Sequence, residues 1–181
     1  MLNSRIWIYL VGLVVLSALA FWVTRSAIIY QAPRSVMSMI ETRIVQGAGG
    51  WNACYHNQIY GPRPQAARRA NPDSIISSMA YDLSQGPVRV SGPVWPRYWS
   101  LSLYQQNSDN YFVINDRELA SDNFDFVLSY GDQIVSESSS VPISSPTRKG
   151  ILLVRRFAAS EDDMPGIIAN QTAMYCGPAL N

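Results

Sequence analysis

The strongest constraint on this chain is an uncharged apolar run, IWIYLVGLVVLSALAFWV, at residues 6–23. A run of about 18 residues is close to the shortest helix that crosses a hydrocarbon core of about 30 Å. Arg5 and Arg25 bracket the run, and aromatic residues lie near both of its ends, where amphipathic rings favour the membrane interface. The run therefore predicts a single N-terminal transmembrane helix within residues 1–30, with residues 6–23 in contact with lipid.

A cleaved signal peptide is the main alternative. The sequence ALA at residues 18–20 resembles a signal-peptidase site after a hydrophobic region. Phe21 and Trp22 follow at once, and AIIY at residues 27–30 continues the apolar character. We favour an uncleaved anchor over a signal peptide, and both over the core helix of a soluble protein. A short tail before a single span usually stays inside, which predicts that the domain lies outside the cytoplasm.

A helix or linker is expected at residues 31–46, between the anchor and the remaining chain. Pro33 is expected to interrupt any helix that continues from the anchor. RSVMSMIETRIV at residues 34–45 then predicts a short amphipathic helix, which QGAGG ends. Its apolar residues near helical spacing are Val36, Met39, Ile40 and Ile44. We expect this helix to pack on the domain core rather than to lie at the membrane surface.

Residues 47–181 have the composition of a β-rich domain. Most of the 11 glycines and 11 prolines lie in this part, between short apolar or alternating segments. We predict a mainly β domain, a sandwich or barrel, with a few helices. The expected strands are residues 74–83, 87–93, 97–106, 111–115, 124–131 and 149–158, with a polar surface loop at 136–150 and a helix that begins near Ser160.

The clearest prediction is a hairpin formed by RYWSLSLYQQ and YFVIN around the turn NSDN. In its first strand Trp99, Leu101 and Leu103 share one face. The opposite face carries Tyr98, Ser100, Ser102 and Tyr104.

Charge and motifs exclude several functions. Charged residues make up 15% of the chain and the net charge is +1, which argues against capture of nucleic acid. The sequence contains none of the common nucleophile, phosphate-loop or metal signatures, so we expect no metal and no cofactor.

His56 is the single histidine, and a structural or surface role suits it better than a catalytic triad. Cys54 and Cys176 either pair as a disulfide, which suits an oxidising compartment, or remain as two buried thiols.

Polar residues at predicted turns and strand ends form the candidate site. If a site exists, we expect it where these side chains converge, although turn residues also bond their own backbone. The cluster consists of Asn71, Asp73, Tyr98, Asn107, Asp109 and Asn110. Arg68 and Arg69, just before a turn, are candidates to contact an anion, although a solvated basic corner explains them as well.

The segment NPDSIISSMAYDLSQGPVRVSGPVWPRYWSLSLYQQNSDNYFVIND, at residues 71–116, resembles the core motif of the domain-of-unknown-function family 1254. The matching pieces are NPD, DL followed by GPV, and YWSL, within a resemblance that covers roughly residues 46–178. Many members carry Tyr shortly after PD, where this chain has Ile75 or Ile76. The resemblance implies a β-rich domain and a companion of the 1214 family, fused or encoded nearby. It implies no established activity.

Together with this resemblance, these observations favour a non-enzymatic module of the bacterial cell envelope that binds a companion protein or an envelope ligand. We expect a single-pass protein of the bacterial inner membrane with its domain in the periplasm. The alternative is a membrane-anchored hydrolase that acts on an ester, a glycoside or a lipid-like substrate. Its candidate residues would be His56, Asp73, Tyr98, Asn107 and Asp109. A third hypothesis is a subunit that completes a composite site with its partner.

Overall fold

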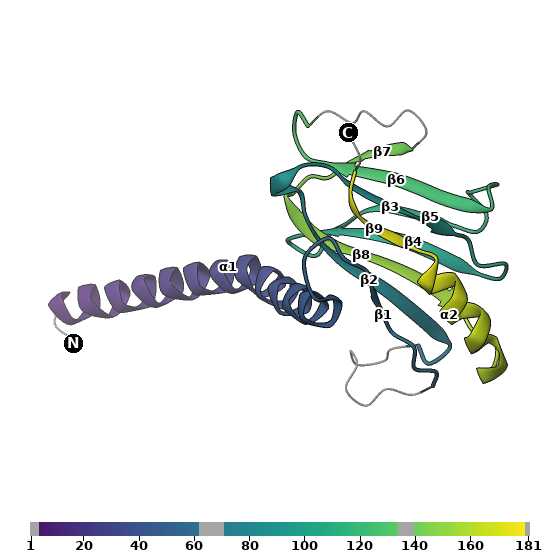
Figure 1. Cartoon of the computed structure of the whole chain (residues 1–181). Helices are drawn as coiled ribbons and strands as arrows, with labels where there is room; N and C mark the ends of the chain where they lie inside the picture. Colours follow the sequence, from purple (N-terminus) through teal and green to yellow (C-terminus); the bar gives the residue numbers. More distant parts are fainter. Residues whose placement is uncertain (1–3, 62–70, 134–139, 180–181) are drawn as a thin grey trace. The chain divides into compact units, whose positions relative to one another are not determined.

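The structure is a computed structural model that describes residues 4–61, 71–133 and 140–179 (Figure 1). The chain divides into two compact units, Met1–Val36 and Met37–Asn181, and each is described by itself.

The first unit is part of helix α1 (Ser4–Ala48). Its large apolar side chains are exposed from Ile6 to Tyr30, and the most apolar stretch of the helix buries none of its surface within the protein. By length and composition α1 is suited to cross a membrane, and a signal sequence would meet the same criteria. Because this stretch is not buried within the protein, it is not the core helix of a soluble protein, which was the third alternative.

Helix α1 continues past Pro33, so the predicted interruption is wrong. Proline removes one backbone donor and crowds the carbonyl four residues earlier. In a long helix this local cost is offset, because every further residue adds a backbone hydrogen bond without a new nucleation step. Next to the proline, the Arg34 guanidinium donates to the Tyr30 carbonyl at 2.7 Å and lies 3.6 Å from the centre of the Tyr30 ring.

The second unit is a β-sandwich of two sheets (Figure 1). Sheet A has the order β1-β2-β8-β4-β5, and sheet B has the order β7-β6-β3-β9. All neighbouring strands are antiparallel except β6 and β7, which are parallel. The strands are β1 (Tyr55–His56), β2 (Ser74–Asp82), β3 (Val88–Pro93), β4 (Trp99–Gln105), β5 (Asn110–Asn115), β6 (Asn123–Ser129), β7 (Val141–Ser144), β8 (Lys149–Phe157) and β9 (Tyr175–Pro178).

The core lies between the two sheets, where alternating residues of each strand meet. The prediction of a mainly β domain is confirmed, and the predicted inward face of β4 lies in this core. Trp99 of sheet A stacks on Phe124 of sheet B, with ring centres 5.8 Å apart. The main buried members are Met79, Tyr81, Leu83, Val88, Val90, Trp99, Leu101, Leu103, Phe124, Phe126, Leu128, Leu152 and Val154.

Strand β7 lies within the segment that was predicted to be a polar surface loop, residues 136–150, so that prediction is wrong for Val141–Ser144. Ile143 is buried in the core opposite Leu128 of β6. The strand escapes recognition because it has one inward apolar residue among serines, and because it contains Pro142. Proline is tolerated here since β7 is an edge strand of sheet B.

The last part of α1 covers part of the outer face of sheet A. Met37 and Ile44 pack there on Ala80 of β2 and Ile151 of β8. The predicted docking of this segment is therefore correct, but three of its four predicted contact residues are wrong: Val36, Met39 and Ile40 are exposed. The buried face instead consists of Met37, Glu41 and Ile44. Because its middle residue is an acid, apolar periodicity in the sequence does not predict this face. Gly49, with φ 80°, allows the chain to leave the helix after Ala48.

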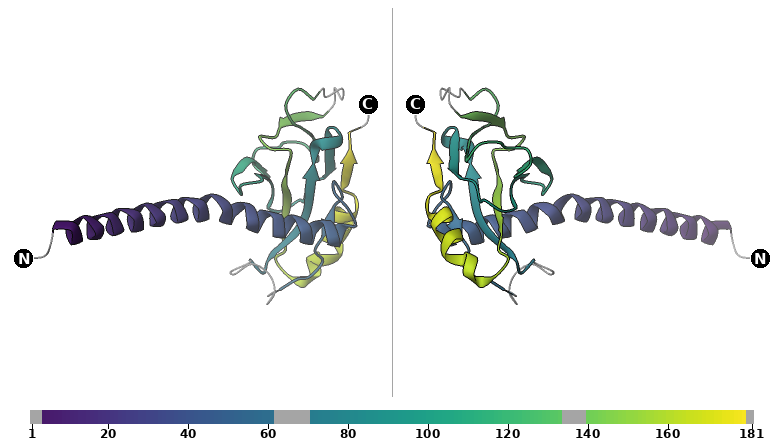
Figure 2. Two further views of the ribbon diagram at one scale, coloured as in Figure 1. Left: turned by 90° about the vertical axis from the view of Figure 1, so that its left-hand side faces the viewer. Right: turned by 90° about the vertical axis from the view of Figure 1, so that its right-hand side faces the viewer.

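Short helices complete the second unit (Figure 2). They are η1 (Leu83–Gln85), η2 (Glu161–Asp163) and α2 (Met164–Thr172). The helix expected near Ser160 thus begins as a 3₁₀ turn, and the Ser160 side chain makes no capping bond. Helix α2 buries Ile167 and Gln171, and the chain then enters β9 at the edge of sheet B.

Cys54 and Cys176 form a disulfide, with their Cα atoms 5.4 Å apart. Cys54 directly precedes β1 at one edge of sheet A, and Cys176 lies in β9 at one edge of sheet B. The bond therefore joins the two sheets covalently. Because it links residues 122 positions apart, the chain-entropy account assigns it about 4–5 kcal/mol of stability.

Candidate functional surface

Strand β8 carries two consecutive arginines, Arg155 and Arg156, and strand alternation directs them to opposite faces of sheet A. Arg156 is paired in register with Trp99 of the core, and it is 1% exposed. Arg155 is paired with Ile76 on β2 and Ser100 on β4, and it points outward. One strand thus supplies a buried cation and a surface cation.

Arg155 is not among the sheet residues that the end of α1 packs against, although it lies on the same outer face. Its Nη1 lies 3.5 Å from the Ser102 hydroxyl, and its Nη2 lies 3.5 Å from the Tyr104 hydroxyl. Both distances are at the long limit of a hydrogen bond. Within the described chain Arg155 forms no ion pair, so its guanidinium retains donor capacity that neutral hydroxyls satisfy weakly.

Exposed apolar side chains surround Arg155. Tyr98 is 56% exposed, Phe157 37% and Val113 50%, and the three come from the start of β4, the end of β8 and the edge strand β5. We call this surface the Arg155 face and define it by Tyr98, Ser100, Ser102, Val113, Arg155 and Phe157. A cation within a rim of aromatic residues is typical of surfaces that recognise a partner.

The buried arginine, Arg156, is held by a polar network without an acid. Its Nη1 donates to the Ser77 hydroxyl at 2.9 Å, its Nε to Asn170 Oδ1 at 2.5 Å, and its Nη2 to Met174 Sδ at 2.8 Å. Burial lowers the pKa of Arg156 to about 10, so the guanidinium still carries its charge at neutral pH. Asn170 in turn donates to the carbonyls of Pro93 and Val94. The network ties α2 to both sheets.

His56 belongs to the same network. Its Nδ1 lies 3.0 Å from the Ser77 hydroxyl, which also accepts from Arg156 Nη1. Burial lowers the pKa of His56, and the nearby Arg156 charge lowers it further. No described carboxylate hydrogen-bonds the ring, and this is the bonding of a structural histidine rather than of a catalytic base.

The structure separates the polar cluster that was expected to converge. Strands β2 and β4 lie on either side of β8 and are both antiparallel to it, so their starts lie at the same end of sheet A. Asn71, Asp73 and Tyr98 are at that end. Asn107, Asp109 and Asn110 form the β4–β5 turn at the other end, so the expected convergence is wrong. A sequence predicts the strands but not their order in the sheet, and the order decides which turn residues lie close together.

Local hydrogen bonds account for most of these turn residues. Asn71 Oδ1 accepts from the Asp73 backbone N–H at 3.0 Å. In the hairpin turn, Asn107 Nδ2 donates to Asp109 Oδ2 at 2.7 Å, and Asn110 Nδ2 donates to the carbonyls of Leu103 and Phe112. Their side chains stabilise turns, as Asn and Asp commonly do.

Of the six cluster residues, Tyr98 alone belongs to the Arg155 face. The two arginines proposed as anion contacts, Arg68 and Arg69, lie outside the described residues. The sequence analysis missed Arg155 itself. The signal was present, because in ILLVRRF the adjacent arginines continue an apolar strand, and alternation must place one of them on each face.

A second charged cluster lies where β2 ends and β8 begins. Lys149 Nζ is 3.3 Å from Asp82 Oδ2 and 4.4 Å from the centre of the Trp51 ring. Glu41 of α1 is only 5% exposed, and its Oε1 atom has no hydrogen-bond partner among the described residues.

The two carboxyl groups of this cluster have opposite pKa shifts. Burial raises the pKa of Glu41, the Lys149 charge opposes this rise, and Asp82 adds to it. Burial also acts to raise the pKa of Asp82, but hydrogen bonds from Ser84 and Lys149 outweigh it, and the net pKa is lowered. Perturbed carboxyl groups in one cluster are candidates for acid–base chemistry.

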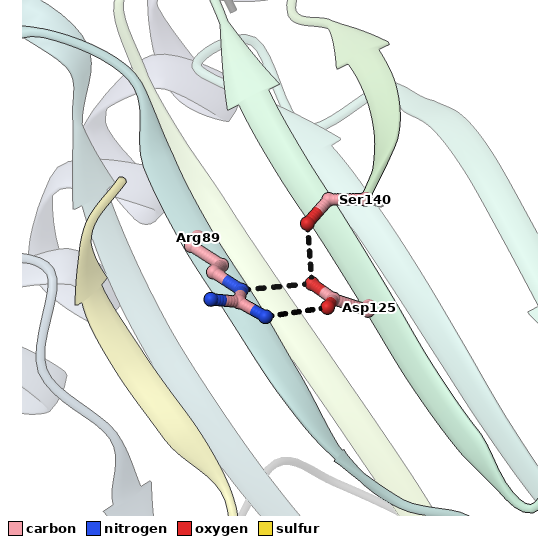
Figure 3. A network of polar contacts seen from close by, with 3 residues as sticks. All are labelled: Arg89, Asp125 and Ser140. Atoms are coloured by element: carbon pink, nitrogen blue, oxygen red, sulfur yellow. Dashed lines mark hydrogen bonds and ion pairs between the residues drawn. The ribbon is translucent and has the colours of Figure 1, made fainter. Parts of the chain in front are cut away.

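The outer face of sheet B carries an ion pair of a different kind (Figure 3). Arg89 of β3 donates from Nε and Nη2 to the two oxygens of Asp125 on β6, at 3.0 and 2.6 Å. The Ser140 hydroxyl also donates to Asp125, at 2.9 Å. The Arg89 bonds lower the pKa of Asp125. This bidentate pair joins neighbouring strands, and we assign it a structural role.

A cleft of about 460 Å³ is lined by Tyr130, Gly131, Asp132, Gln133 and Arg148. The Arg148 guanidinium lies 4.9 Å from the centre of the Tyr130 ring. The Gln133 side chain bonds the backbone of Tyr130 and Leu83, so it holds the turn. In the described part of the chain, no group of three or more His, Cys, Asp or Glu side chains is placed to hold a metal ion.

Together these features define a disulfide-linked β-sandwich domain that follows a long apolar helix. Residues 51–178 match the family described as "Protein of unknown function (DUF1254)", and the chain belongs to this family. The resemblance of the NPD…YWSL segment is thereby confirmed. No curated protein matches the chain.

A solved structure shares the fold of this chain. The VPA0106 protein of Vibrio parahaemolyticus superposes with a TM-score of 0.66 and 16% identity, over 84% of this chain and 36% of that one. An uncharacterized protein from Burkholderia cenocepacia gives a TM-score of 0.44 and 14% identity, over 76% of this chain and 38% of that one. This chain therefore spans little more than a third of either protein.

Proposed function

We propose that the protein is a single-pass component of the bacterial inner membrane whose β domain stands in the periplasm and binds a companion envelope protein. In this proposal the domain is a binding module and catalyses no reaction of its own. The observation that carries the anchor is the exposed apolar surface of α1, which continues well beyond the small-residue site at residues 18–20.

Cleavage after Ala20 would leave much of this surface in water. The six large apolar side chains that follow are each more than half exposed: Phe21, Trp22, Val23, Ile28, Ile29 and Tyr30. Removing one such side chain from water stabilises a protein by about 1.5–3 kcal/mol. A hydrocarbon environment for the uncleaved helix provides that burial, whereas a mature chain beginning at Phe21 would not.

Two further observations support the compartment and the partner. The Cys54–Cys176 disulfide suits an oxidising environment such as the periplasm. The Arg155 face offers a cation and an aromatic rim that the chain does not itself use. Family resemblance points to a companion of the 1214 family, whereas an envelope ligand of another kind would use the same surface.

The test is purification of the full-length tagged protein from its native membranes in mild detergent, followed by mass spectrometry. We expect a mass that includes residues 1–20, retention of the protein in alkali-washed membranes, and a second protein at stoichiometric yield. A chain that begins at Phe21 would refute the anchor. A chain that elutes alone and without ligand would refute the binding module.

A hydrolase is the second candidate function, and the cluster of Glu41, Asp82 and Lys149 is the observation that favours it. Opposed pKa shifts would let Glu41 hold a proton while Asp82 stays ionised, as acid and base roles require. The substrate would be an ester, a glycoside or a lipid-like molecule, at a site that a partner subunit completes. Chromogenic ester and glycoside panels with the full-length protein, alone and with its co-purified partner, test this. Turnover that Asp82→Asn abolishes would favour the hydrolase over the binding module.

A further inference from the structure

We propose that the Arg155 face binds a carboxylate-bearing segment of a partner protein, with Arg155 as the central contact. This inference rests on the proposed function as a binding module and specifies its surface and the chemistry of its partner. The argument comes from how the described arginines of the β domain are bonded.

Two other outward-pointing arginines of the domain have a carboxylate of their own, whereas the exposed Arg43, Arg117 and Arg148 have none among the described residues. Arg89 holds both oxygens of Asp125, and Arg97 donates to Asp163 Oδ2 at 2.9 Å. Arg155, although half-buried, has only the hydroxyls of Ser102 and Tyr104, both at 3.5 Å. A guanidinium presents a planar set of donors that matches a carboxylate in two parallel hydrogen bonds. Such a carboxylate is absent from the described part of this chain, and a partner would supply it.

The hydroxyl groups around Arg155 suit the same ligand. Ser100 of β4 is directly opposite Arg155 of β8 in the strand register. Its side chain makes no hydrogen bond within the described residues. Ser102 already lies beside Nη1. Both serines are almost buried, at 7% and 2% exposed, so their hydroxyls reach only a carboxylate that contacts the sheet directly beside Arg155. Since Arg155 is the one cation among the residues of this face, a singly charged carboxylate fits it better than a phosphate dianion.

The apolar rim indicates a protein segment rather than a free acid. Tyr98, Phe157 and Val113 spread over three strands of an open sheet face, and the cleft described above lies elsewhere, at Tyr130 and Arg148. Small ligands prefer concave sites, whereas proteins bind flat surfaces through a central Arg or aromatic contact that apolar neighbours shield from water. The Arg155 face has the second arrangement.

Site-specific photo-crosslinking of the full chain in its native membranes tests the surface. The probe is p-benzoylphenylalanine, placed in separate variants at Tyr98, at Val113 and, as control, at Tyr175. Tyr175 is also exposed, but it lies on β9 of sheet B. We expect a light-dependent adduct of protein mass from positions 98 and 113 and none from 175. The crosslinked peptide should contain Asp, Glu or a terminal carboxylate.

A charge reversal tests Arg155 itself. Arg155→Glu, combined with the probe at position 98, should reduce the adduct at least about tenfold, since a like charge replaces an ion pair. Arg155→Lys should reduce it less, because the charge remains while the bidentate geometry is lost. Arg148→Glu is the matched control, an exposed arginine outside the face, and should leave the yield unchanged. Reversing the identified partner acid to Arg should restore the adduct of Arg155→Glu.

Each outcome separates this inference from the proposed function. An adduct that persists in a folded Arg155→Glu variant, or one found from position 175 alone, would overturn the inference while the binding module stands. An adduct of lipid or glycan mass would likewise overturn the protein partner. Absence of any adduct, together with elution of a lone protein, would refute the binding module itself. Melting temperatures of all variants, with Arg155→Lys as the milder change, show whether a lost adduct reflects misfolding.

Discussion

Arg155 and Arg156 are neighbours on one strand, carry the same charge, and have opposite surroundings. Arg156 is buried and held by a serine, an asparagine and a methionine from three parts of the chain. Arg155 is on the outer face, and its two contacts with neutral hydroxyls are both long. The difference shows how strand alternation gives two identical side chains different roles: one stabilises the domain, and the other lies on its surface.

The comparison extends to the surroundings of each arginine. The inner network connects β1, β2 and α2, and the disulfide closes the sandwich beside it through Cys54 and Cys176. The outer face has no such closure beyond the turns of α1 around Met37 and Ile44. Substitutions on the inner side should therefore change stability, and substitutions on the outer side should change binding.

Removing the disulfide should have the largest effect. We expect the Cys54→Ser, Cys176→Ser double variant to lose about 4 kcal/mol of unfolding free energy, because the bond closes a long loop in the unfolded chain. Denaturant unfolding of the detergent-solubilised full chain, with and without reductant, measures it. The double variant should be insensitive to reductant, and equal stabilities of the two proteins would contradict a structural disulfide.

Arg156→Ala should follow, with a loss of about 2–4 kcal/mol. The substitution opens a cavity and removes one hydrogen-bond partner from the buried Ser77 hydroxyl and from Asn170 Oδ1. The same unfolding experiment measures it, with Arg155→Ala as the matched control one residue away. Similar losses for the two variants would remove the distinction between the inner and outer arginines.

Glu41→Gln tests the buried carboxyl group of α1 through the pH dependence of stability. The folded-state pKa of Glu41 is raised above 4.5, so its contribution to stability is full below that pH and is lost as the pH rises through the folded pKa. From about pH 4 to about pH 8, the unfolding free energy of Glu41→Gln should therefore rise relative to that of the natural protein. Unfolding curves across this range measure the difference.

Asp125→Asn is the control of opposite sign. The pKa of Asp125 is lowered by Arg89, so its stabilisation is present above 3.8 and is lost as the pH falls through the folded pKa. Relative to the natural protein, this variant should lose stability as the pH rises from below the folded-state pKa of Asp125 to about 4, and the difference should then stay constant at higher pH. A pH-independent difference for Glu41→Gln would show that Glu41 ionises as freely in the folded state as in the unfolded state.

Arg155→Ala should have the smallest effect on stability, within about 0.5 kcal/mol, since its two contacts with neutral hydroxyls are both long and it forms no ion pair within the described residues. Its stability is measured alongside Arg156→Ala, and its binding by the crosslinking experiment. A loss of several kcal/mol would show that Arg155 holds the sheet together and is not free to contact a partner.

The sequence predicts best where one physical pattern decides the structure. Alternation in WSLSLYQ places Trp99 in the core between the sheets and Ser100 on the opposite face of sheet A, and the NSDN turn forms the hairpin as expected. It fails where an exception lies within a pattern: Pro33 stands inside a helix, Pro142 inside a strand, and Glu41 inside a buried face. In each case neighbouring residues tolerate a side chain that local rules would exclude.

The candidate surface was harder to predict because it depends on long-range order. Tyr98 was selected from the sequence, whereas Arg155 becomes its neighbour only through the pairing of β4 with β8. Asn107 and Asp109 were selected for the same chemical reasons as Asp73, yet they lie at the other end of the sheet. Strand order, rather than residue type, separates the surface residues from the turn residues.

The bond between Cys54 and Cys176 also affects how the domain matures. Two cysteines allow one intramolecular pairing, so oxidation requires an oxidant but no reshuffling of mismatched bonds. The second thiol lies in β9, which follows α2 along the chain, so the bond forms only after nearly all of the sandwich has been synthesised. Until then Cys54 carries a free thiol. Loss of that thiol therefore indicates that β9 has paired at the edge of sheet B.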